Sequence, residues 1–307
     1  MLRFPYQKGQ PQIEGTGQPI AQLPAEGHNN HWTRNVVTAP GGKKLYVSIG
    51  SGTNASEEPS PRASVQVMNL DGSGRQTFAS GVRNPVGLDF HPRTGELYAT
   101  INERDGLGDS LVPDYLTRLR SGEFYGWPYA YLSRDRLDPR LTQNGQSLRP
   151  DLVAKTRTPD VLFEAHSAAL GLQFYNGSTF PDTNLKSEQG RSKRMQGCNL
   201  DGDDAPKIIC HLHRLNWYEK YRNGAFVAFR GSWNRSQGTG YKIVFVPFSP
   251  TGRSPGYYED FLTGFLLDPS GPTTWGRPVG LLTLPDGSLL VTEEANNRIY
   301  RVQYTGG

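Results

Sequence analysis

The fold class is decided by one stretch, Asn35-Val36-Val37-Thr38-Ala39-Pro40-Gly41-Gly42-Lys43-Lys44-Leu45-Tyr46-Val47-Ser48-Ile49. Residues 35–38 and 44–49 are short runs rich in β-branched and apolar side chains. The proline and glycines between them favour a tight turn. The stretch therefore predicts two antiparallel strands joined by a turn.

The same pattern returns along the chain. Further strands are expected at 96–101, 225–229 and 288–292, each after a glycine-containing turn. Partner strands are expected before three of the four at 35–38, 87–90 and 280–284, and after three of them at 64–68, 242–247 and 298–303. Helical periodicity is weak, and only 114–120 and the stretch around 217–222 are candidates for a short helix. Repeated small antiparallel units with long loops predict a β-propeller, with a large β-sandwich as the alternative.

Composition excludes several classes of protein. The chain has 307 residues, which suits one large all-β domain. No apolar run approaches the roughly 18 residues of a membrane helix, so we expect no membrane span. The formal net charge is only +4 and no run of five like charges occurs, so we expect no nucleic-acid partner. Two cysteines are too few for a disulfide framework, and the haem-attachment pattern Cys-x-x-Cys-His is absent.

Two segments have no place in the repeat. Residues 1–6 lack the apolar region of a signal peptide and are interpreted as the end of a strand. The segment 182–220 is interpreted as a divergent surface insertion. A zinc site is disfavoured because its candidate ligands match no structural zinc spacing: Cys198, Cys210, His211 and His213. A calcium loop at 201–204 is discarded because Leu212 stands where a glutamate is required.

Five segments carry unusual polar residues next to expected strands: 27–35, 79–88, 102–109, 231–235 and 275–280. They supply histidines, an Arg-Asn pair, an acidic glycine-rich loop and further arginines and tryptophans. The loops on one face of a propeller converge on its axis, so these segments are expected to surround one pocket.

These segments carry a family resemblance. The motifs His31-Trp32-Thr33-Arg34-Asn35, Gly81-Val82-Arg83-Asn84-Pro85-Val86-Gly87, Asn102-Glu103-Arg104-Asp105, Gly231-Ser232-Trp233-Asn234-Arg235 and Gly276-Arg277-Pro278-Val279-Gly280 resemble the sorbosone dehydrogenase-like and soluble aldose sugar dehydrogenase-like quinoproteins. Phe124-Tyr125-Gly126-Trp127-Pro128-Tyr129 adds to the match, which covers most of 1–181 and 221–304. The resemblance implies an all-β, six-bladed propeller that binds pyrroloquinoline quinone (PQQ) with calcium and oxidises C1 of sugars or sugar-derived aldehydes.

The resemblance also implies roles for individual residues. His31 is the expected general base, which takes the proton of the sugar C1 hydroxyl while hydride moves to the quinone. The expected partners of the PQQ carboxylates are the guanidinium groups of Arg83, Arg235 and Arg277. Asn84 is expected to donate to a quinone oxygen. His28 is the alternative base, although its position does not match the family.

The remaining expected contacts concern calcium and the pocket wall. Calcium is expected on the backbone carbonyls of Arg104 and Asp105, with Glu103 or Asp109 in support. Trp233 is assigned to the cofactor site, with a core role for Trp233 and Trp275 left open. His166 lines the pocket mouth or is a buried structural histidine. Residues 126–128 are interpreted as a structural turn.

At the scale of the chain, we expect a single propeller domain over 1–307 with the insertion at about 182–220. The family carries further structure before Leu2, so the chain is expected to lack the first one to two blades. Electrons are expected to pass to an external acceptor such as a separate cytochrome, in a periplasmic or extracellular setting. The alternatives are a non-catalytic propeller that binds carbohydrate or protein, and a calcium-dependent sugar-lactone hydrolase.

Overall fold

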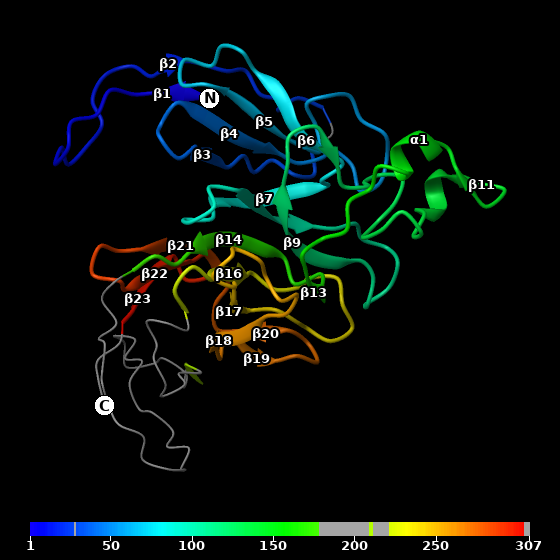
Figure 1. Cartoon of the computed structure of the whole chain (residues 1–307). Helices are drawn as coiled ribbons and strands as arrows, with labels where there is room; N and C mark the ends of the chain where they lie inside the picture. Colours follow the sequence, from blue (N-terminus) through cyan, green and yellow to red (C-terminus); the bar gives the residue numbers. More distant parts are fainter. Residues whose placement is uncertain (28, 178–208, 211–220, 304–307) are drawn as a thin grey trace. The chain divides into compact units, whose positions relative to one another are not determined.

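The computed structural model describes residues 1–27, 29–177, 209–210 and 221–303 (Figure 1). His28, Cys198, His211, His213 and most of the expected 182–220 insertion lie outside this described part. Strands account for nearly all regular structure in it, and the expected all-β class is confirmed. The chain divides into two compact units, residues 1–85 with 120–157 and residues 86–119 with 158–307, and each is described by itself.

The first unit is built on a five-stranded sheet with the order β10-β6-β5-β4-β3. Its strands are β3 (Val36–Thr38), β4 (Lys44–Ile49), β5 (Ser64–Asn69), β6 (Gln76–Ser80) and β10 (Glu123–Phe124). The predicted first hairpin is confirmed, since Val36 pairs with Val47 and Thr38 with Leu45 in an antiparallel register. Strand β10 joins the far edge in parallel to β6.

Short elements complete this unit. They are the pair β1 (Leu2–Arg3) and β2 (Gln18–Pro19), the pair β11 (Thr142–Gln143) and β12 (Gln146–Ser147), the 3-10 turn η1 (Pro139–Leu141) and the helix α1 (Pro150–Val153). One apolar cluster gathers side chains of β4 and β5 around Val47, Ile49 and Met68. A second gathers Phe124, Tyr129, Ala130 and Val153. The 50–54 loop, defined here as the residues that directly follow β4, leaves the sheet at its buried end.

The second unit contains three antiparallel sheets. The first has the order β13-β9-β8-β7, and the first two residues of β7 are counted with the other unit. The second has the order β14-β16-β17-β18-β15, and the third β21-β22-β23. The strands are β7 (Asn84–Phe90), β8 (Leu97–Asn102), β9 (Pro113–Leu119), β13 (Val161–Ala165), β14 (Ala169–Phe174), β15 (Ile209–Cys210), β16 (Ala225–Phe229), β17 (Lys242–Val246), β18 (Glu259–Thr263), β21 (Pro278–Thr283), β22 (Leu289–Glu293) and β23 (Arg298–Val302), with a separate pair β19 (Leu266–Asp268) and β20 (Thr273–Thr274).

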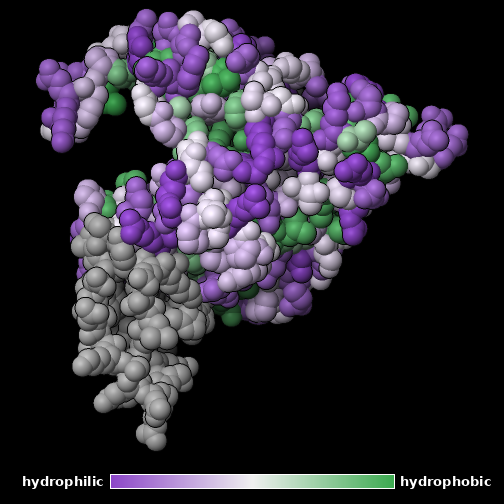
Figure 2. Space-filling model, in the orientation of Figure 1, coloured by the Kyte–Doolittle hydropathy of each residue, from purple (hydrophilic) through white to green (hydrophobic). Residues whose placement is uncertain are grey.

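Packing between these sheets forms the core of the second unit. One apolar cluster contains Phe163, Phe174 and Phe229, and another contains Phe226, Phe245 and Tyr300. Aromatic rings meet mainly edge to face, as between Phe163 and Phe229 with ring centroids 4.8 Å apart. Hydrophilic residues cover much of the described surface on the face shown in Figure 2, as expected when strand side chains pack inward.

The strand predictions hold with small shifts, and one helix candidate is wrong. Residues 114–120, a candidate helix, belong mostly to strand β9, which pairs with β8 on one side and β13 on the other. Five of its seven residues are buried, among them the polar Asp114 and Thr117, so its apolar residues do not alternate and the pattern does not distinguish a strand from a helix. The other candidate, around 217–222, falls mainly outside the described residues. No helix in the described part of the chain is long and apolar enough to cross a membrane.

Candidate functional site

In the first unit, the expected base lies at the start of the first hairpin. His31 precedes β3 and Ser51 follows β4, and an antiparallel hairpin brings these two ends together. The half-buried His31 ring has Nδ1 at 2.9 Å from the Ser51 carbonyl oxygen and at 2.9 Å from Ser51 Oγ. The amide of Asn30 donates to the Gly52 carbonyl at 3.1 Å. The histidine is therefore fixed to the loop on the opposite strand.

The Arg-Asn pair is buried at the entry to β7. Arg83 is 4% exposed, and its guanidinium donates through Nε to the Asn54 carbonyl and through Nη2 to Asn54 Oδ1, both at 3.0 Å. The carbonyl of Arg83 accepts from the Ser51 amide at 2.8 Å. Trp127, in the expected structural turn, donates through its indole to the Asn54 carbonyl at 2.9 Å. The guanidinium is thus held in one place by the 50–54 loop.

Gly50 brings the histidine and the asparagine together. A Cβ atom at Gly50 would lie 2.6 Å from His31 Cβ and 2.6 Å from Asn84 Oδ1, so only glycine fits between them without displacement. Asn84 is 9% exposed, and its Oδ1 is buried without a hydrogen-bond partner among the described residues. A buried amide oxygen normally has a partner, so this one is suited to a ligand. His31, Arg83 and Asn84 therefore gather around the 50–54 loop.

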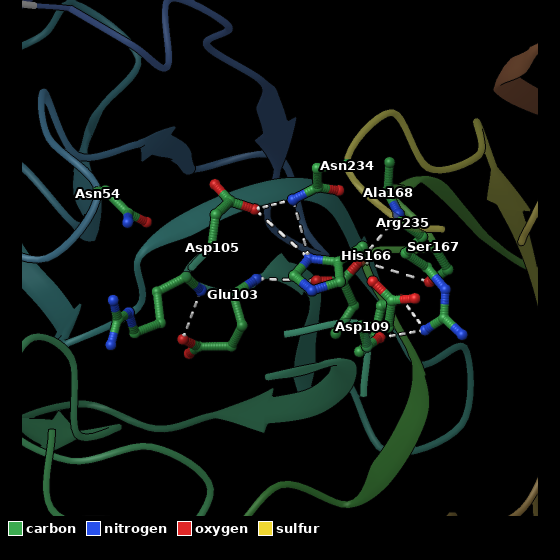
Figure 3. A network of polar contacts seen from close by, with 12 residues as sticks. Asn54, Glu103, Asp105, Asp109, His166, Ser167, Ala168, Asn234 and Arg235 are labelled. Carbon is green, nitrogen blue, oxygen red and sulfur yellow. Dashed lines mark hydrogen bonds and ion pairs between the residues drawn. The ribbon is translucent and has the colours of Figure 1, made fainter. Parts of the chain in front are cut away.

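In the second unit, a polar network joins three loops (Figure 3). His166 Nε2 lies 3.0 Å from the Gly108 carbonyl, and its Nδ1 lies 3.4 Å from Asp105 Oδ1 and 3.3 Å from Asn234 Nδ2. Asn234 donates to Asp105 Oδ1 at 2.8 Å. The hydrogen bond with Asp105 raises the pKa of His166 above its ordinary value, although burial opposes it. His166 is 7% exposed, which favours the structural interpretation over a place at a pocket mouth.

Arg235 crosses the same network. Its Nη1 donates to the carbonyl oxygens of Asp109 and Ala165, and its Nε to the Gln237 carbonyl. The Asp109 carboxylate instead accepts from the amide and hydroxyl of Ser236, and these hydrogen bonds lower the pKa of Asp109. Arg235 forms no ion pair with a carboxylate within the described residues. Its guanidinium is therefore held in place by carbonyl oxygens, and its charge also acts on the nearby Asp109 carboxylate without a direct contact.

A buried carboxylate supports the segment assigned to calcium. Asp114 on β9 accepts from the Glu103 amide at 2.9 Å, from the Ala168 amide at 2.8 Å and from the Ser167 hydroxyl at 3.3 Å. It fixes the chain next to Arg104 and Asp105. Among the described residues, no group of three or more His, Cys, Asp or Glu side chains is arranged around a metal position. The oxygens available at the expected calcium segment are backbone carbonyls and the partly exposed Asp105 carboxylate, a donor set of the type that calcium prefers.

The last two expected residues have different environments. The guanidinium of Arg277 lies 5.8 Å from the centre of the Tyr241 ring and makes no hydrogen bond or ion pair in the described structure. Trp233 is 72% exposed and so is not a core residue. Trp275 stacks on Tyr300 with ring centroids 5.4 Å apart and packs against the core. Trp275 therefore packs against the core, whereas Trp233 is exposed.

Some polar residues around these sites were missed by the sequence analysis, namely Ser51, Glu58 and Asp114. Their only signal is position: Ser51 follows a strand within a Gly-Ser-Gly-Thr segment, and Asp114 is the second residue of a strand that was interpreted as a candidate helix. Neither signal identifies a partner. The roles given to the eight expected site residues stay predictions: His31, Arg83, Asn84, Arg104, Asp105, Trp233, Arg235 and Arg277.

Comparison with known proteins places the chain in a family. The family model described as glucose/sorbosone dehydrogenase matches residues 2–190, and a model described as TrAA12-like matches residues 120–305. A relative from Borreliella burgdorferi, an uncharacterised protein, is 32% identical over 290 residues. That alignment covers 94% of this chain and 64% of the relative, so the chain spans about two thirds of that protein.

Solved structures agree on the fold. A carbohydrate-active enzyme of family AA12 from Trichoderma reesei is 18% identical with a TM-score of 0.72, covering 98% of this chain and 75% of that structure. The PQQ domain of pyranose dehydrogenase from Coprinopsis cinerea, in its holo form, is 20% identical with a TM-score of 0.63. This second likeness covers 90% of this chain and 70% of that structure. At such identities the likeness concerns the fold.

Proposed function

Because the chain belongs to the glucose/sorbosone dehydrogenase family and to the TrAA12-like family over its later part, we propose that it takes part in PQQ- and calcium-dependent oxidation of a sugar or sugar-derived aldehyde at C1. The proposed fold is a six-bladed propeller, and the antiparallel sheets of this chain are proposed to be some of its blades. Electrons leave to a separate acceptor. The observation that carries the proposal is the cluster of His31, Arg83 and Asn84 around the 50–54 loop.

His31 is the proposed general base. Histidine is the side chain best suited to accept a proton from a substrate hydroxyl, and the half-buried His31 is the expected base within this cluster. Its ring is fixed on one side by Ser51, so its second nitrogen keeps a constant direction. Its proposed task is to take the C1 hydroxyl proton of the sugar as the substrate is oxidised.

Arg83 and Asn84 are the proposed cofactor contacts of the first unit. When bound, PQQ would supply the electron-accepting quinone, and calcium would supply Lewis acidity. A guanidinium fixed through Asn54 binds a carboxylate without first having to be ordered, which favours binding. The Asn84 amide has an unused buried oxygen beside Gly50, the residue that His31 also approaches.

The second unit contributes further proposed ligands. Within the described residues, the Arg277 guanidinium makes no ion pair and Arg235 donates its hydrogen bonds to carbonyls, so both arginines are suited to bind an anionic ligand. We assign them, with Trp233, to the cofactor. Arg104 and Asp105 are assigned to calcium through their carbonyl oxygens, in a segment that Asp114 holds in place.

The test is reconstitution of the purified chain with PQQ and calcium. The absorbance of the bound quinone reports cofactor binding, and sugar-dependent dye reduction reports turnover. We expect His31→Gln to lower turnover about 100-fold or more while binding is kept. Lys43→Gln, at an exposed side chain, is the control and should leave both unchanged. Binding without turnover in the unmodified chain would favour a non-catalytic carbohydrate- or protein-binding propeller, and absence of binding would contradict the proposal.

A further inference from the structure

Behind His31 lies a pair of residues that the proposed chemistry does not use, Ser51 and Glu58. Ser51 is fully buried, and its carbonyl oxygen and Oγ both lie 2.9 Å from His31 Nδ1. The Ser51 hydroxyl donates its own hydrogen to the Thr53 carbonyl at 2.6 Å. Its oxygen can therefore only accept on the side of the histidine, as the carbonyl does. Nδ1 faces two acceptors.

Two acceptors at one ring nitrogen fix the position of the imidazole hydrogen. A neutral imidazole carries one N–H, and its other nitrogen has the lone pair. The hydrogen belongs on Nδ1 because only a donor satisfies the Ser51 oxygens, so the lone pair is on Nε2. The opposite tautomer would direct a lone pair at two oxygens and would present an N–H to the substrate.

Glu58 fixes the backbone on which this arrangement depends. Its Oε1 accepts from the amide and the hydroxyl of Thr53, both at 2.6 Å, and its Oε2 accepts from the Gly52 amide at 2.7 Å. Hydrogen bonds to an ionised carboxylate are stronger than those between neutral groups. They hold Thr53, the residue whose carbonyl takes the Ser51 hydrogen, and the Ser51–Gly52 peptide, whose carbonyl faces His31. On the other side, the Ser51 amide donates to the Arg83 carbonyl.

We infer that Ser51 and Glu58 form a positioning relay that keeps His31 in its Nδ1–H form and so makes Nε2 the proton acceptor. Ser51 acts on the ring directly, and Glu58 acts through Gly52 and Thr53. Both are positioning residues, because the inference gives neither a contact with substrate. The inference rests on the proposed role of His31 as base, but the tautomer itself is a property of the chain without cofactor.

The first experiment measures the tautomer. Long-range ¹H–¹⁵N NMR spectra of the ¹⁵N-labelled full chain without PQQ, recorded at mildly alkaline pH, distinguish a protonated from an unprotonated ring nitrogen. The signals of His31 are identified by their loss in His31→Gln. We expect Nδ1 to be protonated and Nε2 not. Protonation at Nε2 would overturn the inference, and this measurement needs no variant of the relay to fold.

The second experiment removes the relay. Ser51→Ala deletes one acceptor, and Glu58→Gln replaces one carboxylate oxygen with an amide nitrogen, which donates and cannot accept. Both should shift the His31 signals toward a mixture of tautomers and lower kcat about fivefold, the effect of one lost hydrogen bond, with cofactor affinity unchanged. The matched control is Ser64→Ala, which deletes a buried hydroxyl bonded to the Pro61 carbonyl and to Gln66. It should leave the His31 signals as they are.

The outcomes separate this inference from the proposed function. An Nδ1–H tautomer that shifts in Ser51→Ala, in a chain without dye reduction, would support the relay and contradict the dehydrogenase. Turnover with His31 signals that are the same in Ser51→Ala, Glu58→Gln and Ser64→Ala would support the dehydrogenase and overturn the relay.

Discussion

At the scale of single residues, Gly50 decides whether the candidate base and its asparagine neighbour fit. In Gly50→Ala the new methyl group would lie 2.6 Å from His31 Cβ, which is attached directly to the backbone and cannot move alone. We expect the variant to lose most of the proposed dehydrogenase activity and about 1–3 kcal/mol of unfolding free energy, as overpacking does. Dye reduction and urea denaturation measure the two effects.

A second glycine gives the control for this prediction. A Cβ at Gly271 would meet nothing within 4 Å, and its backbone is not in the left-handed region. Gly271→Ala should therefore keep both activity and stability. If Gly50→Ala and Gly271→Ala had the same activity and stability, the close approach of His31 and Asn84 to Gly50 would not be needed for function.

The pH dependence of stability has a contribution from Asp89. Burial raises the pKa of this carboxyl to about 6, although it accepts hydrogen bonds from the amides of Phe174 and Phe90. The folded state therefore keeps the proton at pH values where the unfolded state has lost it. The stabilisation is complete below about pH 4, near the unfolded pKa, and is lost as the pH rises through 6.

Asp89→Asn tests this contribution, because an amide does not titrate. We expect the free energy of unfolding of the variant, relative to the unmodified chain, to rise by about 2–3 kcal/mol between pH 4 and pH 7. Denaturant titrations of both proteins across this range measure it. A difference that does not change with pH would contradict the raised pKa.

Residue types could be predicted from the sequence, but their contacts could not. His31, Arg83 and Asn84 belong to recognisable motifs, and each lies beside a predicted strand. Ser51 and Glu58 are seven positions apart in a loop, and nothing in that spacing shows that one holds the other through Thr53. Hydrogen bonds between loop residues depend on backbone geometry, which carries no periodic signal.

At the scale of elements, β9 fixes the turn between β13 and β14. Asp114 on β9 accepts from the Ser167 hydroxyl and the Ala168 amide in that turn, and also from the Glu103 amide after β8. His166 and Ala168 adopt positive φ of 65° and 52°, so the turn needs this outside support. The carboxylate therefore joins two connections of the second unit to strand β9.

Asp114→Ala should be strongly destabilising, because it leaves the buried amide of Glu103 and the partly buried amide of Ala168 without their acceptor. We expect a loss of about 2–4 kcal/mol of unfolding free energy, measured by thermal or urea denaturation. Asp135→Ala, at an exposed aspartate, is the control and should stay within about 0.5 kcal/mol of the unmodified chain. Equal stability of the two variants would remove the supporting role of Asp114.

Elements were predicted well where a turn signal preceded an alternating or apolar run. Strands β4 and β16 have the predicted boundaries, because glycine-containing turns precede both. Strand β9 was read as a candidate helix, since its paired position between β8 and β13 buries both faces and removes the alternation. A position inside a sheet is set by strands far away in the sequence, so a local pattern does not reveal it.

At the scale of the whole chain, the family explains the type of fold, and ligand binding tests the function. A ligand that binds only the folded state stabilises it by mass action, by about 2.7 kcal/mol at 100 times its Kd. We therefore expect PQQ with calcium to raise the Tm of the chain. A chelator should reverse the part of this rise in Tm that depends on calcium. Differential scanning calorimetry measures both.

The location of the stabilisation provides the sharper test of the proposal. If Arg83 and Asn84 bind the cofactor, amide hydrogen exchange should slow in the 50–54 loop, whose backbone and Asn54 side chain hold Arg83. The amides of β17, buried in the core of the second unit, should serve as an internal reference. A rise in Tm without slower exchange in the 50–54 loop would contradict the proposed cofactor contacts of the first unit, because a ligand held by Arg83 must restrict the loop that positions it.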